Sequence, residues 1–157
     1  MPVFDFTHVS GFSFRHRALG FIAAEDVPEL DAKEHFESLE VKDSDLVRSR
    51  FGHWLEGKVY DKYFHGWPNN QKYKECFVFK WEKKRKPQRQ YGFLCHPKPQ
   101  PAEKGFVLCV LAYFDTKEDT TDYTILDRLN KLRQDLNVTQ AIKKQYPEYG
   151  GKDKWTN

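Results

Sequence analysis

The side chains best suited to chemistry in this chain are lysines and arginines around one expected hairpin. The candidates on its strands and its turn are Lys80, Lys83, Lys84, Arg85 and Arg89. Lys117 follows the next apolar strand, and Tyr123 opens the last expected helix. Strand ends of an antiparallel sheet can meet at one edge, so these residues are expected to converge there. Lysine and arginine in such a place contact phosphates, which indicates RNA as a ligand.

Three aromatic residues and one histidine extend this group. Tyr91, Trp81 and Tyr123 are candidates to stack on unpaired bases. The alternative for Trp81 and Tyr91 is a place in the core or on a sheet face, and Tyr123 can equally pack against the sheet. His96 is an RNA-binding candidate because it ends the strand that begins at Arg89. The other five histidines are scattered, so solvent-exposed or structural roles are expected for them.

The residue patterns of the common catalytic and cofactor sites are missing from the sequence. There is no GxGxxG or GxxxxGK[ST] phosphate loop, no HExxH or paired His/Cys metal spacing, and no GxSxG turn. We therefore expect no cofactor and no metal. Cys76, Cys95 and Cys109 lie far apart in apolar runs, so they are expected to be small buried hydrophobic residues.

Charge is unevenly distributed, although the net charge is only +3. Residues 25–45 hold nine acidic residues and two lysines, whereas residues 72–104 hold ten lysines or arginines and three glutamates. The second stretch is about +7 by this count, which favours a polyanionic partner. A basic loop that is merely solvated explains the same count equally well.

Length and composition favour one globular domain. The chain has 157 residues, and its 16% aromatic content argues against disorder. No apolar run approaches the roughly 18 residues of a membrane span, and no signal-peptide pattern opens the chain. We expect a cytoplasmic protein with no membrane partner. Residues 1–145 are expected to form a single α+β domain, followed by a tail over 146–157.

Hydrophobic spacing predicts the elements that position the basic residues. Val47, Phe51 and Trp54 recur at helical spacing and predict a helix over 45–56. The remaining expected elements are short strands within 3–24, a short helix over 30–39, a loop over 65–70, strands over 76–82, 89–95 and 106–114, and a last helix with Ile125, Leu129, Leu132 and Leu136 on one stripe.

The order of these pieces resembles the RelE/HigB-like toxins of toxin–antitoxin systems, including their phage-derived relatives. The resemblance covers residues 74 to about 135. It rests on the strand CFVFKW, the turn KKRKPQ, the strands RQYGFLCH and GFVLCVLAYF, the turn DTKEDTTDY and the leucine-striped helix. It implies a small antiparallel sheet with flanking helices, in which a RelE-like core over 45–136 follows an N-terminal extension over 1–40. It also implies a metal-independent mRNA endoribonuclease that often acts in the ribosome and is silenced by an antitoxin protein.

Enzymes of this family cleave RNA by in-line attack of a 2′-hydroxyl on the adjacent phosphate. The resemblance implies that Arg89 holds this phosphate and that Lys117 stabilises the transition state. It implies that Tyr123 stacks on a base or assists proton transfer. Lys80 matches the basic position of the first hairpin strand, but it can act as a base only if its pKa is lowered.

The sequence departs from the family pattern after the long strand. The family usually has two adjacent basic residues there, whereas Asp115 and Thr116 precede the single Lys117. Two alternatives to an enzyme stay open. One is a non-catalytic RNA-binding or ribosome-associated protein of the same fold, and the other is a protein-interaction module whose basic hairpin docks on an acidic partner. The first 40 residues are expected to form either a capping strand and helix or an autoinhibitory acidic cover over the basic residues.

Overall fold

One mixed sheet of six strands forms the centre of the molecule. The computed structural model describes residues 2–98, 105–116 and 123–150. The strands are β1 Phe4–His8, β2 Arg17–Ala24, β3 Phe64–Gly66, β4 Cys76–Lys83, β5 Lys86–Cys95 and β6 Val107–Asp115. The helices of the described part are α1 Ala32–Glu37, α2 Val41–Leu55, α3 Tyr123–Gln134 and α4 Leu136–Lys143. Across the sheet, the strand order is β1-β2-β6-β5-β4-β3.

The direction of β2 overturns the expected fold. β2 runs parallel to β6, with Arg17 to Phe21 opposite Val107 to Leu111, and all other neighbouring strands are antiparallel. The prediction of a small antiparallel RelE-like sheet with an N-terminal extension is therefore wrong. Residues 1–40 supply β1, β2 and α1, so they are part of the sheet and its cover. β2 lies between β1 and β6 within the sheet, and its apolar run is covered on both faces, because Ala18 and Ile22 belong to one core and Leu19 and Phe21 to the other.

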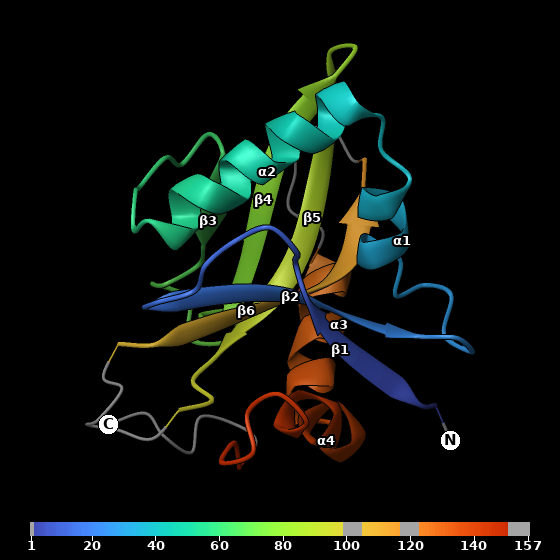
Figure 1. Ribbon diagram of the computed structural model, residues 1–157, viewed down its shortest axis with the longest axis vertical. Coiled ribbons are helices and arrows are strands. Elements are labelled where there is room, and N and C mark those ends of the chain that lie inside the picture. Colours follow the sequence, from blue (N-terminus) through green and yellow to red (C-terminus); the bar gives the residue numbers. More distant parts are fainter. Residues whose placement is uncertain (1, 99–104, 117–122, 151–157) are drawn as a thin grey trace.

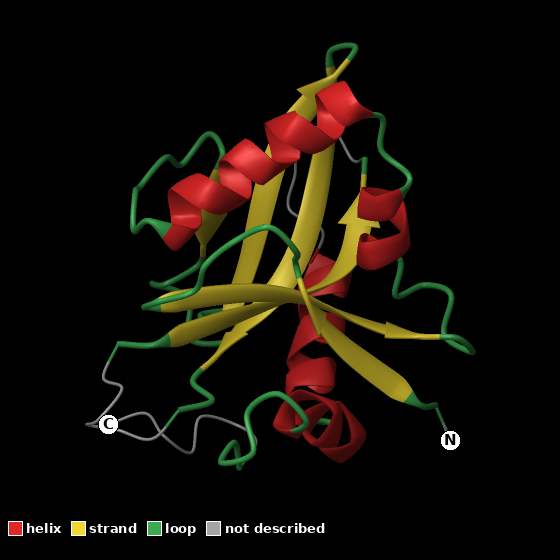
Figure 2. Ribbon diagram, viewed as in Figure 1, coloured by secondary structure: helices red, strands yellow, loops and turns green. Residues whose placement is uncertain are grey.

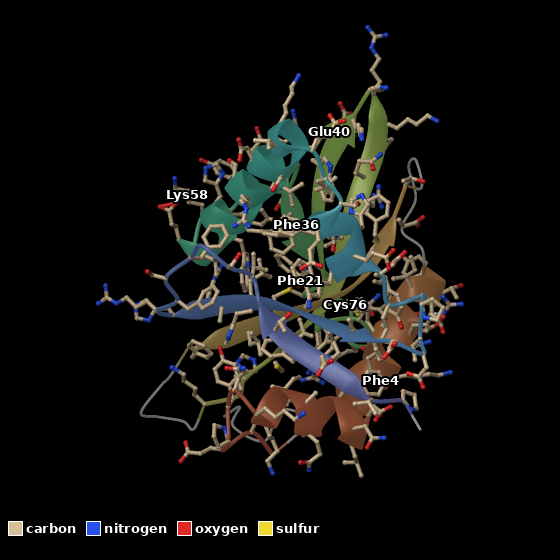
Figure 3. All side chains as sticks on the ribbon, turned by 45° about the vertical axis from the view of Figure 1, so that its right-hand side comes forward. Phe4, Phe21, Phe36, Glu40, Lys58 and Cys76 are labelled. Carbon is tan, nitrogen blue, oxygen red and sulfur yellow. The ribbon has the colours of Figure 1, made fainter. Side chains whose placement is uncertain are left out.

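Helices cover both faces of this sheet (Figures 1 and 2). α1 and α2 pack on one face, and α3 and α4 pack on the other. Alternate residues of β4 divide between the two cores, because successive side chains of a strand point to opposite faces. Cys76 and Val78 face α3 and α4, whereas Phe77 and Phe79 face α1 and α2. On the α1 side, Phe21 of the sheet and Phe36 of α1 point toward each other, with ring centroids 5.5 Å apart (Figure 3).

The helix expected over 45–56 is confirmed, with a start four residues earlier than expected. α2 begins at Val41, buries Val47, Phe51 and Trp54, and ends at Leu55. The last helix differs more from its prediction, because the expected single helix is divided into α3 and α4, and the residues of the expected apolar stripe fall on both. Asp135 caps α4 by accepting a hydrogen bond from Asn137 N, so the chain turns after α3. As a result Leu136 is 78% exposed and does not belong to the core.

The core continues into the segment expected to be a tail. Tyr149 is 1% exposed, and the Tyr146 hydroxyl lies 2.8 Å from His8 Nε2 on β1. The three cysteines are buried and unlinked, as expected. Burial raises the pKa of Cys76 and of Cys95 to about 12. No helix in the described part of the chain is long and apolar enough to span a membrane.

Candidate functional site

The basic hairpin expected from the sequence is confirmed. β4 pairs with β5 along its whole length, from Cys76 opposite Phe93 to Lys83 opposite Lys86, so both strands run further toward the turn than expected and leave Lys84 and Arg85 as the two turn residues. Both have positive φ, 51° and 67°. Two-residue hairpins favour this geometry and usually use Asn-Gly for it, because other side chains are strained there. Two exposed cations therefore occupy the turn at a cost in backbone energy.

Lys80 and Arg89 lie directly opposite each other on neighbouring strands. Both side chains emerge on the sheet face that carries α3, since Val78 and Tyr91 two residues away belong to the core on that side. Arg89 is also opposite Asp115 at the end of β6. The expected convergence of Lys80 and Arg89 is thus confirmed. The acid that the sequence placed after the long strand lies beside them.

The Lys80 ammonium group is partly withdrawn from solvent. Its Nζ donates a 2.6 Å hydrogen bond to the carbonyl oxygen of Asp61, in the segment before β3. Burial lowers the pKa of Lys80, the positive charge of Arg89 lowers it further, and Asp61 opposes the change. This direction is the one that acid–base work by a lysine requires.

Tyr91 supports Arg89 from the same strand. Its hydroxyl accepts a 3.2 Å hydrogen bond from Arg89 Nη1, and its side chain is fully buried. The ring therefore offers no face to a base, contrary to the stacking role considered for it. The geometry makes Tyr91 a positioning residue for the guanidinium group. Arg89 Nε and Asp115 Oδ2 are buried and have no hydrogen-bond partner within the described residues.

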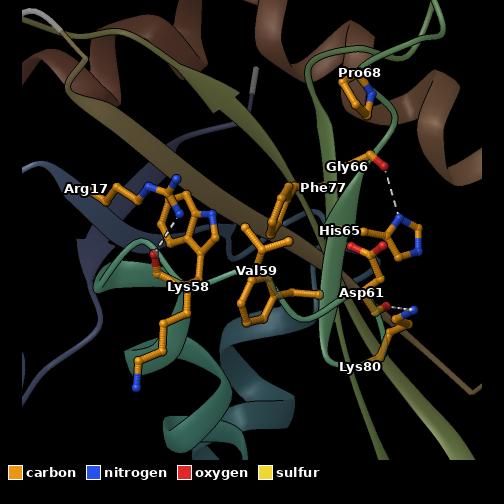
Figure 4. A pocket seen from close by; sticks show the side chains of 11 residues that line it. Arg17, Lys58, Val59, Asp61, His65, Gly66, Pro68, Phe77 and Lys80 are labelled. Carbon is orange, nitrogen blue, oxygen red and sulfur yellow. Dashed lines mark hydrogen bonds between the residues drawn. The ribbon is translucent and has the colours of Figure 1, made fainter.

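His65 joins this pair, although no pattern in the sequence indicated it. His65 lies on edge strand β3 opposite Val78, in the row next to Lys80 (Figure 4). Its Nδ1 is 3.0 Å from the carbonyl oxygen of Gly66, which fits a donating Nδ1–H and leaves the Nε2 lone pair free to accept. Burial lowers the pKa of His65, the Gly66 carbonyl opposes this, and the charges of Lys80 and Arg89 lower the pKa again. We call Lys80, Arg89 and His65 the hairpin site.

The other expected site residues are dispersed. Lys117 lies outside the described residues. Tyr123 starts α3, is 52% exposed, and has its ring 5.4 Å from that of Tyr73. His96 lies at the opposite end of β5, where its Nδ1 is 3.1 Å from the carbonyl oxygen of Phe106. At about 3.3 Å per residue, His96 is roughly 23 Å along the strand from Arg89, so it does not belong to the hairpin site.

The acidic stretch of residues 25–45 contacts the hairpin at its tip and also further down, where Gln90 Nε2 donates a 3.1 Å hydrogen bond to the carbonyl oxygen of Ala32. Asp43, in the first turn of α2, forms a 3.5 Å ion pair with Lys83. Figure 1 shows the start of α2 beside the hairpin tip. Lys84 and Arg85 at the turn are exposed. The segment thus neutralises one cation near the tip and does not cover Lys84 and Arg85.

In the described part of the chain, no group of three His, Cys, Asp or Glu side chains is placed to hold a metal ion. Comparison with models of protein families, with curated proteins and with solved structures found no match to this chain.

Proposed function

We propose that the protein is a metal-independent endoribonuclease that cleaves translated mRNA at the hairpin site and acts as the toxin of a toxin–antitoxin pair. The observation that carries the proposal is the grouping of two cations, a neutral imidazole and an exposed basic turn on one hairpin and its neighbouring edge strand. The biological setting rests on the resemblance of residues 74–135 to RelE/HigB-like toxins. A cytoplasmic location belongs to the same proposal.

The chemistry can be assigned atom by atom. Arg89 and Lys80 hold the scissile phosphate and balance the charge that builds on its oxygens. His65 Nε2 takes the proton from the 2′-hydroxyl, whose oxygen then bonds to phosphorus. The bond from phosphorus to the 5′-oxygen breaks, and Lys80 gives that oxygen a proton. The products are a 2′,3′-cyclic phosphate and a 5′-hydroxyl, and the pKa directions of His65 and Lys80 suit a base and an acid.

The turn residues Lys84 and Arg85 extend the binding surface along the RNA. Phosphate contacts of this kind position a nucleic acid without reading its sequence. Their strained backbone supports a binding role, because a turn selected for stability alone would use Asn-Gly.

One observation favours a second candidate, a protein that binds RNA without cutting it. Asp115 lies opposite Arg89, and a carboxylate there repels a phosphate. In addition, Lys80 Nζ already donates to the Asp61 carbonyl oxygen, so it has to change partner to reach a leaving oxygen.

Mapping of mRNA 3′ ends in a translating extract that contains a chelator separates these two functions. We expect wild type to cut within translated frames and Arg89→Ala to cut about 100- to 1,000-fold more slowly. Arg15→Ala, which removes an exposed arginine outside the hairpin, is the matched control and should retain full activity. Salt-sensitive RNA binding without cut products would establish the non-catalytic candidate. Full activity of a folded Arg89→Ala protein would refute the assigned site.

The pH profile tests the roles of His65 and Lys80. Because its folded pKa is lowered, His65 is neutral above pH 6.5 and loses its role as base only below that value. The pKa of Lys80 is also lowered, so as the pH rises Lys80 gives up its proton before pH 10.5 is reached. The single-turnover rate should therefore form a bell, and His65→Gln should remove the acid limb. An unchanged acid limb in His65→Gln would exclude His65 as the base.

A further inference from the structure

A cavity of about 590 Å³ opens beside the hairpin site at the β3 edge of the sheet. Apolar walls come from Trp54 of α2, Val59 of the following loop and Phe77 of β4. Lys80 and His65 also line it, but from the other face of the sheet, so the cavity reaches the hairpin site only around the β3 edge (Figure 4).

Arg17 gives the cavity a flat cationic wall. Its guanidinium carbon lies 4.9 Å from the centre of the Trp54 ring, and its Nη1 donates a 2.7 Å hydrogen bond to the Trp54 carbonyl oxygen. These two contacts hold the guanidinium plane in place over the indole. Unstacked bases of single-stranded RNA bind to guanidinium planes and to aromatic side chains in this way.

The charge around the cavity suits a nucleotide. Among the described residues, the cavity is lined by the three cations Arg17, Lys58 and Lys80 and by one acid, Asp61. Lys58 pairs only loosely with Glu56, at 3.9 Å, and its side chain is 46% exposed. An apolar floor with cations at its margin matches a base with phosphates on either side.

We propose that this cavity receives one unstacked base of the RNA whose phosphate lies on Lys80 and Arg89. The inference rests on the proposed function and adds a base subsite to it. The cavity walls recognise the flat face of the base. Lys80 lies at the junction, where the ribose-phosphate chain passes from the cavity to Arg89.

Three probes of equal length separate phosphate binding from base binding. They are a single-stranded RNA, an abasic ribose-phosphate chain and inorganic polyphosphate. We expect all three to bind wild type in a salt-dependent way, with RNA about tenfold tighter than the abasic chain, since one stacked base is worth about 5- to 100-fold in affinity. Arg89→Ala should weaken all three.

Val59→Phe tests the cavity itself. Val59 is 79% exposed, so a larger side chain there can fill the cavity without disturbing the core. We expect this variant to bind RNA and the abasic chain equally, with polyphosphate affinity unchanged, while the control Val59→Thr keeps the preference. Equal binding of RNA and abasic chain by wild type, or a preference that survives in Val59→Phe, overturns the subsite and leaves phosphate binding intact. Failure of all three probes to bind overturns the proposed function itself.

Discussion

Replacement of Lys84-Arg85 by Asn-Gly should make the protein more stable and a poorer RNA binder. Both residues have positive φ, a conformation that costs a side-chain-bearing L-residue about 1 to 2 kcal/mol. Asn and Gly adopt this conformation readily. Glycine, however, lowers the free energy of unfolding by about 0.5 to 1 kcal/mol, because it has more conformational freedom in the unfolded chain. The net gain should be about 1 to 3 kcal/mol, and for a domain of this size each kcal/mol raises the Tm by about 2 to 4 °C.

The binding of RNA should change in the opposite direction. Each phosphate contact on a single strand contributes about 0.7 to the slope of log affinity against log salt. Loss of both turn cations should therefore flatten the slope by about 1.4. Thermal unfolding and RNA titrations at several salt concentrations measure the two effects on the same samples.

A matched variant separates backbone strain from charge. Lys84→Gln with Arg85→Gln removes both charges and keeps side chains that suffer the same strain. It should lose salt dependence as the Asn-Gly variant does, without gaining stability. An Asn-Gly variant no more stable than wild type would refute the strain argument. An unchanged salt slope would show that the turn does not contact RNA.

Three further predictions concern the packed parts of the molecule. Asp43→Asn frees Lys83 from its ion pair and should raise RNA affinity a few-fold at low salt, with a salt slope steeper by about 0.7; an unchanged slope would remove Lys83 from the binding surface. Burial lowers the pKa of His35 from 6.5 to about 4, so only the unfolded chain takes up this proton between these values, and stability should fall as pH drops from 6.5 to 4. The loss should be about 1 to 2 kcal/mol after allowance for partial solvent screening, and denaturant titrations of wild type and His35→Gln measure it. Gly92→Ala should destabilise the fold by roughly 2 kcal/mol, because a Cβ there would lie 2.5 Å from the Val110 carbonyl oxygen, whereas Gly52→Ala, with its nearest neighbour at 3.6 Å, should stabilise α2 in the same unfolding assay.

Local patterns were sufficient for most elements of the second half of the chain. The helix with Val47, Phe51 and Trp54 and the basic-tipped hairpin are set by spacing and turn composition within short windows. The register that places Lys80 opposite Arg89 did not follow from the sequence, because the strands extend to Lys83 and Lys86 and shorten the expected turn to two residues.

The sheet as a whole depended on contacts between distant segments. The parallel pairing of β2 with β6 joins residues such as Arg17 and Val107, and no local period records such a partner. The same limit hid His65, which reaches the hairpin site only because β3 pairs with β4 at the edge of the sheet. The core placement that the sequence allowed for Tyr91 is confirmed, and only the folded sheet shows that its hydroxyl lies beside Arg89.

The sequence by itself determined where the cations are and which strands carry them, since charge and hydrophobic period are local properties. The tertiary structure decided which of those cations meet and what surrounds them. Burial and the neighbouring charge of Arg89 lower the pKa of Lys80, and the β3 edge brings His65 and the Arg17–Trp54 cavity alongside. A pKa and a cavity depend on atoms that converge from distant parts of the chain, so neither exists before the chain has folded.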